Sequence, residues 1–363
     1  MPLYELELPA LLSDTPLGFL AALGVLHLTD GTLEQPPRLS WRGPAAPAVL
    51  HTHHPLTHHE LTDILITQLP DQPGEEPLPQ APGILSLKRH SKAAPSDPLR
   101  MPIELALHQL REHARAERDK NLDTARWFTA LVNQLHIDRG KKGNNAPSRP
   151  ATDTPWYTTT TPLFGRSGGM TIANNWTKAL KGCGWTKAAS KKHTTPPPVH
   201  AALHGALTRW ERVDDYAGAN LDHFSTGDAH MVSNGEASQR GIPGATWLAL
   251  NGFVAFRLTG TTRHSQTTSW DRTTPNGSLT WPVWSIPLTA TAITTLLEHP
   301  LVRTPNPTQL HNLGVTTIYS AHRTRAAQGF GPLQPGYSTH PPTRTTTSEP
   351  QLTPEYTHRT QAK

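Results

Sequence analysis

The sequence predicts an α+β protein, with helical and β-rich segments in separate stretches, basic loops between them and a disordered C-terminal tail. Three observations support this fold class. Apolar and polar residues alternate from Leu3 to Leu8, which is the period of a half-buried strand. Helical patterns with capping residues follow, and the last third contains long apolar stretches around the turn residues Asn276-Gly277.

The helices are predicted from capping residues and apolar periodicity. The first should run from Asp14-Thr15-Pro16 to about Thr29, because a capping residue and an early proline precede an apolar run that Asp30-Gly31 ends. Further helices are expected at Leu56–Leu69, Pro102–Lys120, Asp123–Leu135, Thr171–Leu180, Val199–Val213 and Ala290–Glu298. The helices at 102–120 and 123–135 should pair as a helical hairpin.

Later strands are expected at Leu39–Arg42, Thr246–Leu258, Ser278–Trp284 and Val315–Ser320. The stretches at 246–258 and 278–284 should pair with each other across the Asn276-Gly277 turn. Trp247, Trp281 and Trp284 are interpreted as core or subunit-interface anchors. Pro282 between the last two argues for an edge strand or a bend, which suits a partner surface.

The chain of 363 residues is long enough for about two domains of ordinary size. We divide it into an N-terminal α/β and helical region (1–137), a basic loop region that carries glycine and asparagine (138–198), a C-terminal β-rich region (199–336) and a disordered tail (337–363). The tail is rich in Thr, Pro and His and has almost no large apolar residues, so it lacks the means to form a core.

Composition narrows the class of partner. The formal charge of +5 and a pI near 9.4 favour anionic partners, nucleic acid first and anionic membrane second. A lone cysteine, Cys183, excludes an internal disulfide framework and a Cys-rich zinc site, and it is interpreted as a small hydrophobe. No apolar run of about 18 residues and no basic leader are present, so we expect a cytoplasmic protein that does not enter a membrane.

Three clusters of basic and amide side chains indicate nucleic-acid binding. Cationic loops bind phosphates through charge and counterion release, glycines allow close backbone approach, and Asn or Trp can pair with or stack on bases. The clusters are Arg139, Lys141, Lys142, Asn144, Asn145 and Arg149; Arg166, Asn174, Asn175, Trp176, Lys178 and Lys181; and Lys187, Lys191, Lys192 and His193. The alternative is an ordinary solvated surface with a glycine turn packed on a strand.

Catalytic chemistry has weaker support, and we expect neither a catalytic residue nor a cofactor. No Gly-Lys-Ser, Gly-Lys-Thr or G-x-G-x-x-G motif is present, which argues against ATP or dinucleotide binding. The histidines at 51, 53, 54, 58 and 59 reflect a composition with 21 histidines more than a metal site. The alternative of a different class is a metal-dependent nuclease, built on Asp222, His223, Asp228 and His230.

Several segments together carry a family resemblance. They are Thr15–Leu26, Leu39-Ser40-Trp41, the stretch from Gly168-Gly169 to Asn174-Asn175, Thr246–Gly252, Trp281–Leu288 and His322–Arg325. In their order, which spans most of residues 1 to 335, the chain resembles the Cas8-type large subunits of type I-G (formerly I-U) CRISPR effector complexes.

The resemblance implies a non-catalytic subunit of a crRNA-guided surveillance complex. Such a subunit would recognise a protospacer-adjacent motif in double-stranded target DNA, help to open the duplex, contact other effector subunits and recruit a helicase-nuclease in trans. The three basic clusters, supported by Arg323 and Arg325, are the candidate DNA contacts. A third interpretation is an interaction module that uses the Trp281–Leu288 surface without nucleic acid.

Overall fold

The computed structural model describes residues 3–71, 76–85, 99, 101–120, 123–139, 156–165, 170–185, 198–225, 239–261, 264–326 and 329–340. Helices and strands occupy separate segments, as the α+β prediction requires. The helices are α1 (Pro16–Asp30), α2 (His58–Thr67), α3 (Ile103–Lys120), α4 (Thr124–Leu131), α5 (Ile172–Gly182), α6 (Val199–Thr208), α7 (Pro243–Asn251), α8 (Ala290–Glu298) and α9 (Pro307–Asn312). Among these, none combines the length and apolar character needed to cross a bilayer.

Within the described residues, the strands form two larger antiparallel sheets and three two-stranded sheets. The N-terminal sheet has the order β1 (Tyr4–Leu12), β3 (Pro47–Thr52), β2 (Arg38–Trp41). The C-terminal sheet runs β10 (Trp270–Asp271), β11 (Ser278–Trp284), β12 (Val315–Ala326), β13 (Gly329–Leu333), with β14 (Tyr337–His340) also paired to β12. The two-stranded sheets are β4 (Val132–Arg139) with β5 (Trp156–Thr160), β6 (Val213–Asp214) with β7 (Arg240–Gly241), and β8 (Leu258–Thr261) with β9 (His264–Thr267).

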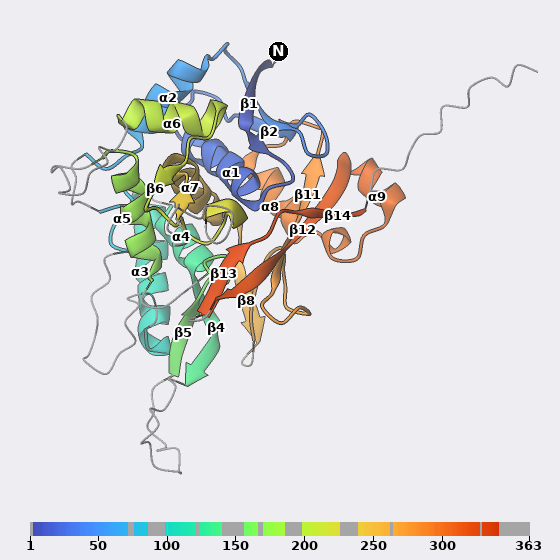
Figure 1. Cartoon of the computed structure of the whole chain (residues 1–363). Coiled ribbons are helices and arrows are strands. Elements are labelled where there is room, and N and C mark those ends of the chain that lie inside the picture. Colours follow the sequence, from blue (N-terminus) through green and yellow to red (C-terminus); the bar gives the residue numbers. More distant parts are fainter. Residues whose placement is uncertain are drawn as a thin grey trace, which may run out of the picture.

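Helix α1 lies at the centre of the molecule against α7, with α2 and α6 to one side and the C-terminal sheet to the other (Figure 1). Its apolar residues surround the whole helix, which is the pattern of a buried element, and the side chains from Leu17 to Leu26 are buried. The Thr15 side chain caps its start by accepting a hydrogen bond from the Gly18 N–H. The predicted first helix is therefore confirmed.

Aromatic side chains join the N-terminal sheet to the C-terminal sheet. The Phe19 ring lies 5.5 Å from Trp281 and 5.9 Å from Trp41, centroid to centroid. Trp281 donates its indole N–H to the Ser13 carbonyl, and Trp284 donates to the Leu39 carbonyl, both at 2.8 Å. These tryptophans are core anchors of one chain, and a single hydrophobic core collects side chains from the regions 1–137, 138–198 and 199–336.

The stretch predicted as a strand at 246–258 is mainly helical. Residues 243–251 form α7, a 3₁₀ turn follows at Gly252–Ala255, and only Leu258 begins a strand, β8. A short, fully buried apolar run has no polar face to reveal its period, so sequence pattern does not separate helix from strand there. Strand β11 consequently pairs with β12 and β10 instead, and the Asn276-Gly277 turn connects β10 to β11.

Two helix ends and several strands also differ from the predictions. The helix expected to end at Leu135 ends at Leu131, because the chain continues as β4. Part of the region 138–198, which was expected to be a basic loop region, forms β5, the partner of β4. The helix expected to reach Val213 ends at Thr208. Strand β3 was not predicted, and β14 begins the segment expected to be a disordered tail, whose remainder at 341–363 lies outside the described residues.

A buried histidine on α1 gives the fold a pH dependence. Burial, and secondarily the charge of Arg126, lower the pKa of His27 to about 3, and its ring packs edge-on against Trp127. An unfolded chain binds this proton near pH 6.5, whereas the folded protein does not, so the contribution to stability is present above pH 6.5 and is lost as the pH falls. From neutral pH to about pH 5 the loss should be about 2 kcal/mol.

Urea unfolding at a series of pH values measures this loss, with His27→Gln as the comparison, since glutamine does not titrate. The difference in unfolding free energy between wild type and variant should change with pH below about 6.5. Parallel curves for the two proteins would contradict the assignment to His27.

Candidate nucleic-acid interface

Helix α5 presents three polar side chains on its outer face. Asn174, Lys178 and Lys181 are exposed and follow the i, i+4, i+7 spacing of one helical face. The opposite face carries Ile172 and Trp176, which are buried in the core, so the helix is fixed in rotation. The Thr171 side chain caps its start by accepting from the Asn174 N–H at 3.1 Å.

The charges of the two lysines on this face are not neutralised by a described carboxylate. Helix α5 contains no Asp or Glu, and neither Lys178 nor Lys181 forms an ion pair with a described residue. Arg115 of α3 differs in this respect, since it lies 2.6 Å from Glu112 on the same helix. The outer face of α5 therefore carries positive charge that an anionic ligand could neutralise.

The remaining members of the second cluster divide between the core and the undescribed part of the chain. Asn175 is 2% exposed and donates its side-chain N–H to the Thr171 carbonyl at 2.9 Å, so it does not present an amide to a ligand. Trp176 is buried and packs edge-on against Trp127. Both interpretations as base contacts are thus corrected. Arg166 lies outside the described residues.

Arg323 is a buried structural cation. Its Nη1 donates to the carbonyls of Asn220 and Gly331 at 3.1 and 3.0 Å, and its Nη2 donates to the Leu163 carbonyl at 2.8 Å. The guanidinium also lies 5.3 Å from the centre of the Trp270 ring. Burial lowers its pKa to about 9, and only 4% of the residue is exposed.

The interpretation of Arg323 as a DNA contact is therefore corrected. The side chain joins three segments that are distant in sequence, and Gly165 leaves the space that its guanidinium fills. Arg325, two residues further along β12, is exposed and pairs in register with the exposed Phe330. Only this second arginine is placed to meet a ligand.

The first and third clusters lie mostly outside the described residues. Strand β4 ends at Arg139, which pairs with Trp156 at the start of β5. The undescribed residues of the two clusters are Lys141, Lys142, Asn144, Asn145 and Arg149 between these strands, and Lys187, Lys191, Lys192 and His193 after α5. At the other end of the hairpin, Asn133 of β4 donates to the Thr259 carbonyl of β8 at 3.2 Å, which ties the hairpin to the core.

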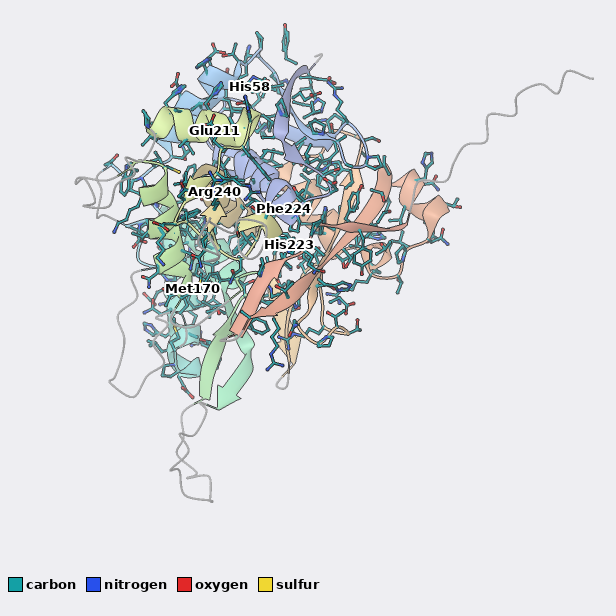
Figure 2. The ribbon with its side chains drawn as sticks, in the orientation of Figure 1. His58, Met170, Glu211, His223, Phe224 and Arg240 are labelled. Atoms are coloured by element: carbon teal, nitrogen blue, oxygen red, sulfur yellow. The ribbon has the colours of Figure 1, made fainter. Side chains whose placement is uncertain are left out.

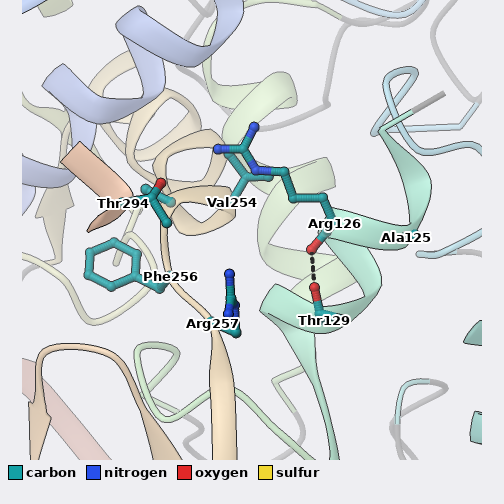
Figure 3. Close-up of a pocket in the computed structure, with 8 residues that line it drawn as sticks. Ala125, Arg126, Thr129, Val254, Phe256, Arg257 and Thr294 are labelled. Atoms are coloured by element: carbon teal, nitrogen blue, oxygen red, sulfur yellow. Dashed lines mark hydrogen bonds between the residues drawn. The ribbon is translucent and has the colours of Figure 1, made fainter. Parts of the chain in front are cut away.

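A small cavity of about 390 Å³ lies between α4, α8 and the segment that leads into β8 (Figure 3). Arg126 reaches across it from α4 toward Val254, and Arg257 lies on the opposite wall, in the segment that leads into β8. Arg257 Nε is 3.3 Å from Glu298, while Arg126 is 3.9 Å from Asp123. Sequence reasoning missed both arginines, because each stands alone in the chain, outside any basic cluster.

The Asp-His segment of the nuclease alternative is only half described. Asp222 accepts from Arg212 Nη1 at 2.7 Å and from the Phe224 N–H at 3.0 Å, so both carboxylate oxygens already have donors. His223 and Phe224 lie on the face that also carries Arg240 (Figure 2). Asp228 and His230 fall outside the described residues. Within the described part, no three His, Cys, Asp or Glu side chains have their donor atoms placed to hold a metal ion.

Cys183, which follows the C-terminal end of α5, is buried, and burial raises the pKa of its thiol to about 12. A thiol with this pKa stays protonated at neutral pH and is a poor nucleophile. This supports its interpretation as a small hydrophobe.

No protein-family model matches the chain, and no curated protein matches it.

Proposed function

We propose that this chain is a non-catalytic DNA-binding subunit of a crRNA-guided type I CRISPR surveillance complex. In this role it contributes to recognition of the protospacer-adjacent motif and to opening of the target duplex, beside the other effector subunits. A separate helicase-nuclease acts in trans. The observation that carries the proposal is the outer face of α5, with two lysines that have no described carboxylate partner and an exposed Asn174.

The composition of this face supports phosphate binding with limited base contact. Lysine contacts phosphate oxygens without regard to sequence, whereas an asparagine amide can pair with a base edge. The same helix is preceded in sequence by Arg166 and followed by Lys187, Lys191 and Lys192, so the positive charge extends along the chain at both ends of it. Such an arrangement suits a protein that follows a DNA backbone and reads a short motif.

Replacing Lys178 and Lys181 together by alanine should weaken binding to a duplex and reduce its salt dependence. Each lysine that neutralises a phosphate releases counterions, so the slope of log K against log salt should fall by about 2 in magnitude. Fluorescence anisotropy of a labelled duplex, titrated at several KCl concentrations, measures both quantities.

The matched control is Arg38→Ala with Arg303→Ala, which removes two exposed positive charges from other elements and gives the same net charge. This control should keep a wild-type salt slope. Equal losses in the two double variants would show that net charge, not the face of α5, accounts for binding. Incubation of the chain with labelled DNA and Mn²⁺ tests whether the chain cleaves DNA. Cleavage that disappears in Asp228→Ala would support the nuclease alternative instead.

A further inference from the structure

The cavity between α4 and α8 is lined by positive charge without a carboxylate. Its walls come from α4, from the segment that leads into β8 and from α8, which are far apart in the sequence (Figure 3). Among its described lining residues, Arg126 and Arg257 are the charged ones, and none is an aspartate or a glutamate. The volume of about 390 Å³ lies within the range of pockets that hold small ligands.

The two arginines approach the cavity from different walls. Arg126 extends over it from α4, and Arg257 points toward the same space from the opposite wall (Figure 3). The neighbouring side chains Trp127 and Phe256 are buried in the core, so both arginines stand on fixed backbone. The arginine side chains themselves are 36% and 60% exposed, which leaves them within reach of a ligand from solvent.

Both guanidinium groups have hydrogen-bond donors to offer. Arg126 Nη1 lies 3.9 Å from Asp123 Oδ2, and Arg257 Nε lies 3.3 Å from Glu298 Oε1. Within the described part of the chain, neither guanidinium completes a hydrogen bond. Partly exposed ion pairs contribute only about 0–1 kcal/mol each, so an anion that accepts hydrogen bonds from both arginines replaces these contacts at little cost.

The other polar groups of the lining are hydroxyls whose protons are already used. Thr129 donates to the Arg126 carbonyl at 2.8 Å, and Thr294 donates to the Ala290 carbonyl at 3.1 Å. The arginines are therefore the side-chain donors that a ligand meets, and the matching ligand is an acceptor with negative charge. A phosphate group fits this requirement, because a planar guanidinium presents paired N–H donors to two of its oxygens.

The rest of the lining is apolar. Val254, Ala255 and Phe256 form one wall and are buried, and Ala125 contributes a methyl group from α4. A bare phosphate ion would leave this wall in contact with water. An organic group attached to the phosphate would cover the wall and add the free energy of burying apolar surface.

We propose that this cavity binds a small phosphate monoester, with the phosphate held by Arg126 and Arg257 and the organic group on the wall of Val254, Ala255 and Phe256. None of its described lining residues belongs to α5. The cavity is thus an anion site separate from the outer face of α5, and its test does not depend on DNA binding.

Isothermal titration calorimetry of the full chain with phenyl phosphate tests the site. Arg126→Gln and Arg257→Gln should each weaken binding by about tenfold or more, because each removes hydrogen bonds to a charged group. The matched control is Arg38→Gln, which removes an exposed arginine of β2 outside the cavity and should bind as the wild type does. Circular dichroism checks that each variant is folded.

A steric variant separates binding in a cavity from attraction to a charged surface. Ala125→Leu keeps both arginines but fills part of the space, so it should also weaken the binding of phenyl phosphate. Inorganic phosphate should bind the wild type more weakly than phenyl phosphate does, because it buries no apolar surface. The proposal would be overturned by absence of saturable binding of phenyl phosphate, by equal affinities in Arg257→Gln and Arg38→Gln, or by an unchanged affinity in Ala125→Leu.

Discussion

Replacing Arg323 by methionine should destabilise the protein by about 3 kcal/mol, although the change removes a charge from the core. The carbonyls of Leu163, Asn220 and Gly331 each lose a charged donor and remain buried. Hydrogen bonds to charged groups contribute about 1.5–3 kcal/mol each, and relief of the buried charge offsets only part of that loss. Urea unfolding followed by far-UV circular dichroism gives the unfolding free energy.

Arg325→Met is the matched control, because it removes the same side chain from the same strand two residues away. Arg325 is exposed and its substitution should change stability by less than about 0.5 kcal/mol. The two variants also separate structure from ligand binding, since of the two arginines only Arg325 is exposed. A similar loss of stability in both would contradict the structural role assigned to Arg323.

The elements predicted correctly have signals that are local in the sequence. Thr15, Thr57, Thr171 and Thr289 each precede a helix and accept a hydrogen bond from the backbone three residues later. This bond depends on a few consecutive residues, so the sequence alone is enough to place the helix start. Strand β1 was similarly visible, because one of its faces is exposed and the period of two survives.

The errors concern segments whose conformation is decided by distant partners. Helix α7 is buried on all sides, so its composition resembles a core strand until α1 is packed against it. Strand β4 continues directly from α4 without a breaker, and its pairing with β5 replaces the helical hydrogen bonds that propensity favours there. Strand β3 was hidden by its own composition, since Pro47 and His51 lie within it.

The candidate site residues also divide into those whose signal is local in the sequence and those whose position depends on distant segments. The outer face of α5 was visible because Asn174, Lys178 and Lys181 follow helical spacing in one short segment. Residue type does not reveal that Arg323 is buried, because arginine is usually exposed and two of its three carbonyl partners, Leu163 and Asn220, come from distant segments.

Replacing Gly24 by alanine should cost about 3 kcal/mol of unfolding free energy, despite the higher helix propensity of alanine. A Cβ at Gly24 would overlap the Leu248 carbonyl oxygen of α7, and one at Gly252 would overlap the Leu20 carbonyl oxygen of α1. The two glycines thus set the separation of α1 and α7, and backbone atoms have no rotamer by which to yield.

Gly205→Ala in α6 is the control, since nothing lies within 4 Å of a Cβ at that position. Alanine should stabilise the protein there by up to about 1 kcal/mol through helix propensity alone. Chemical denaturation of both variants should therefore show changes in unfolding free energy of opposite sign, although the substitution is Gly→Ala in a helix in both cases. A stabilising Gly24→Ala would mean that α1 and α7 pack less closely than described, and the core that positions α5 would then need a different explanation.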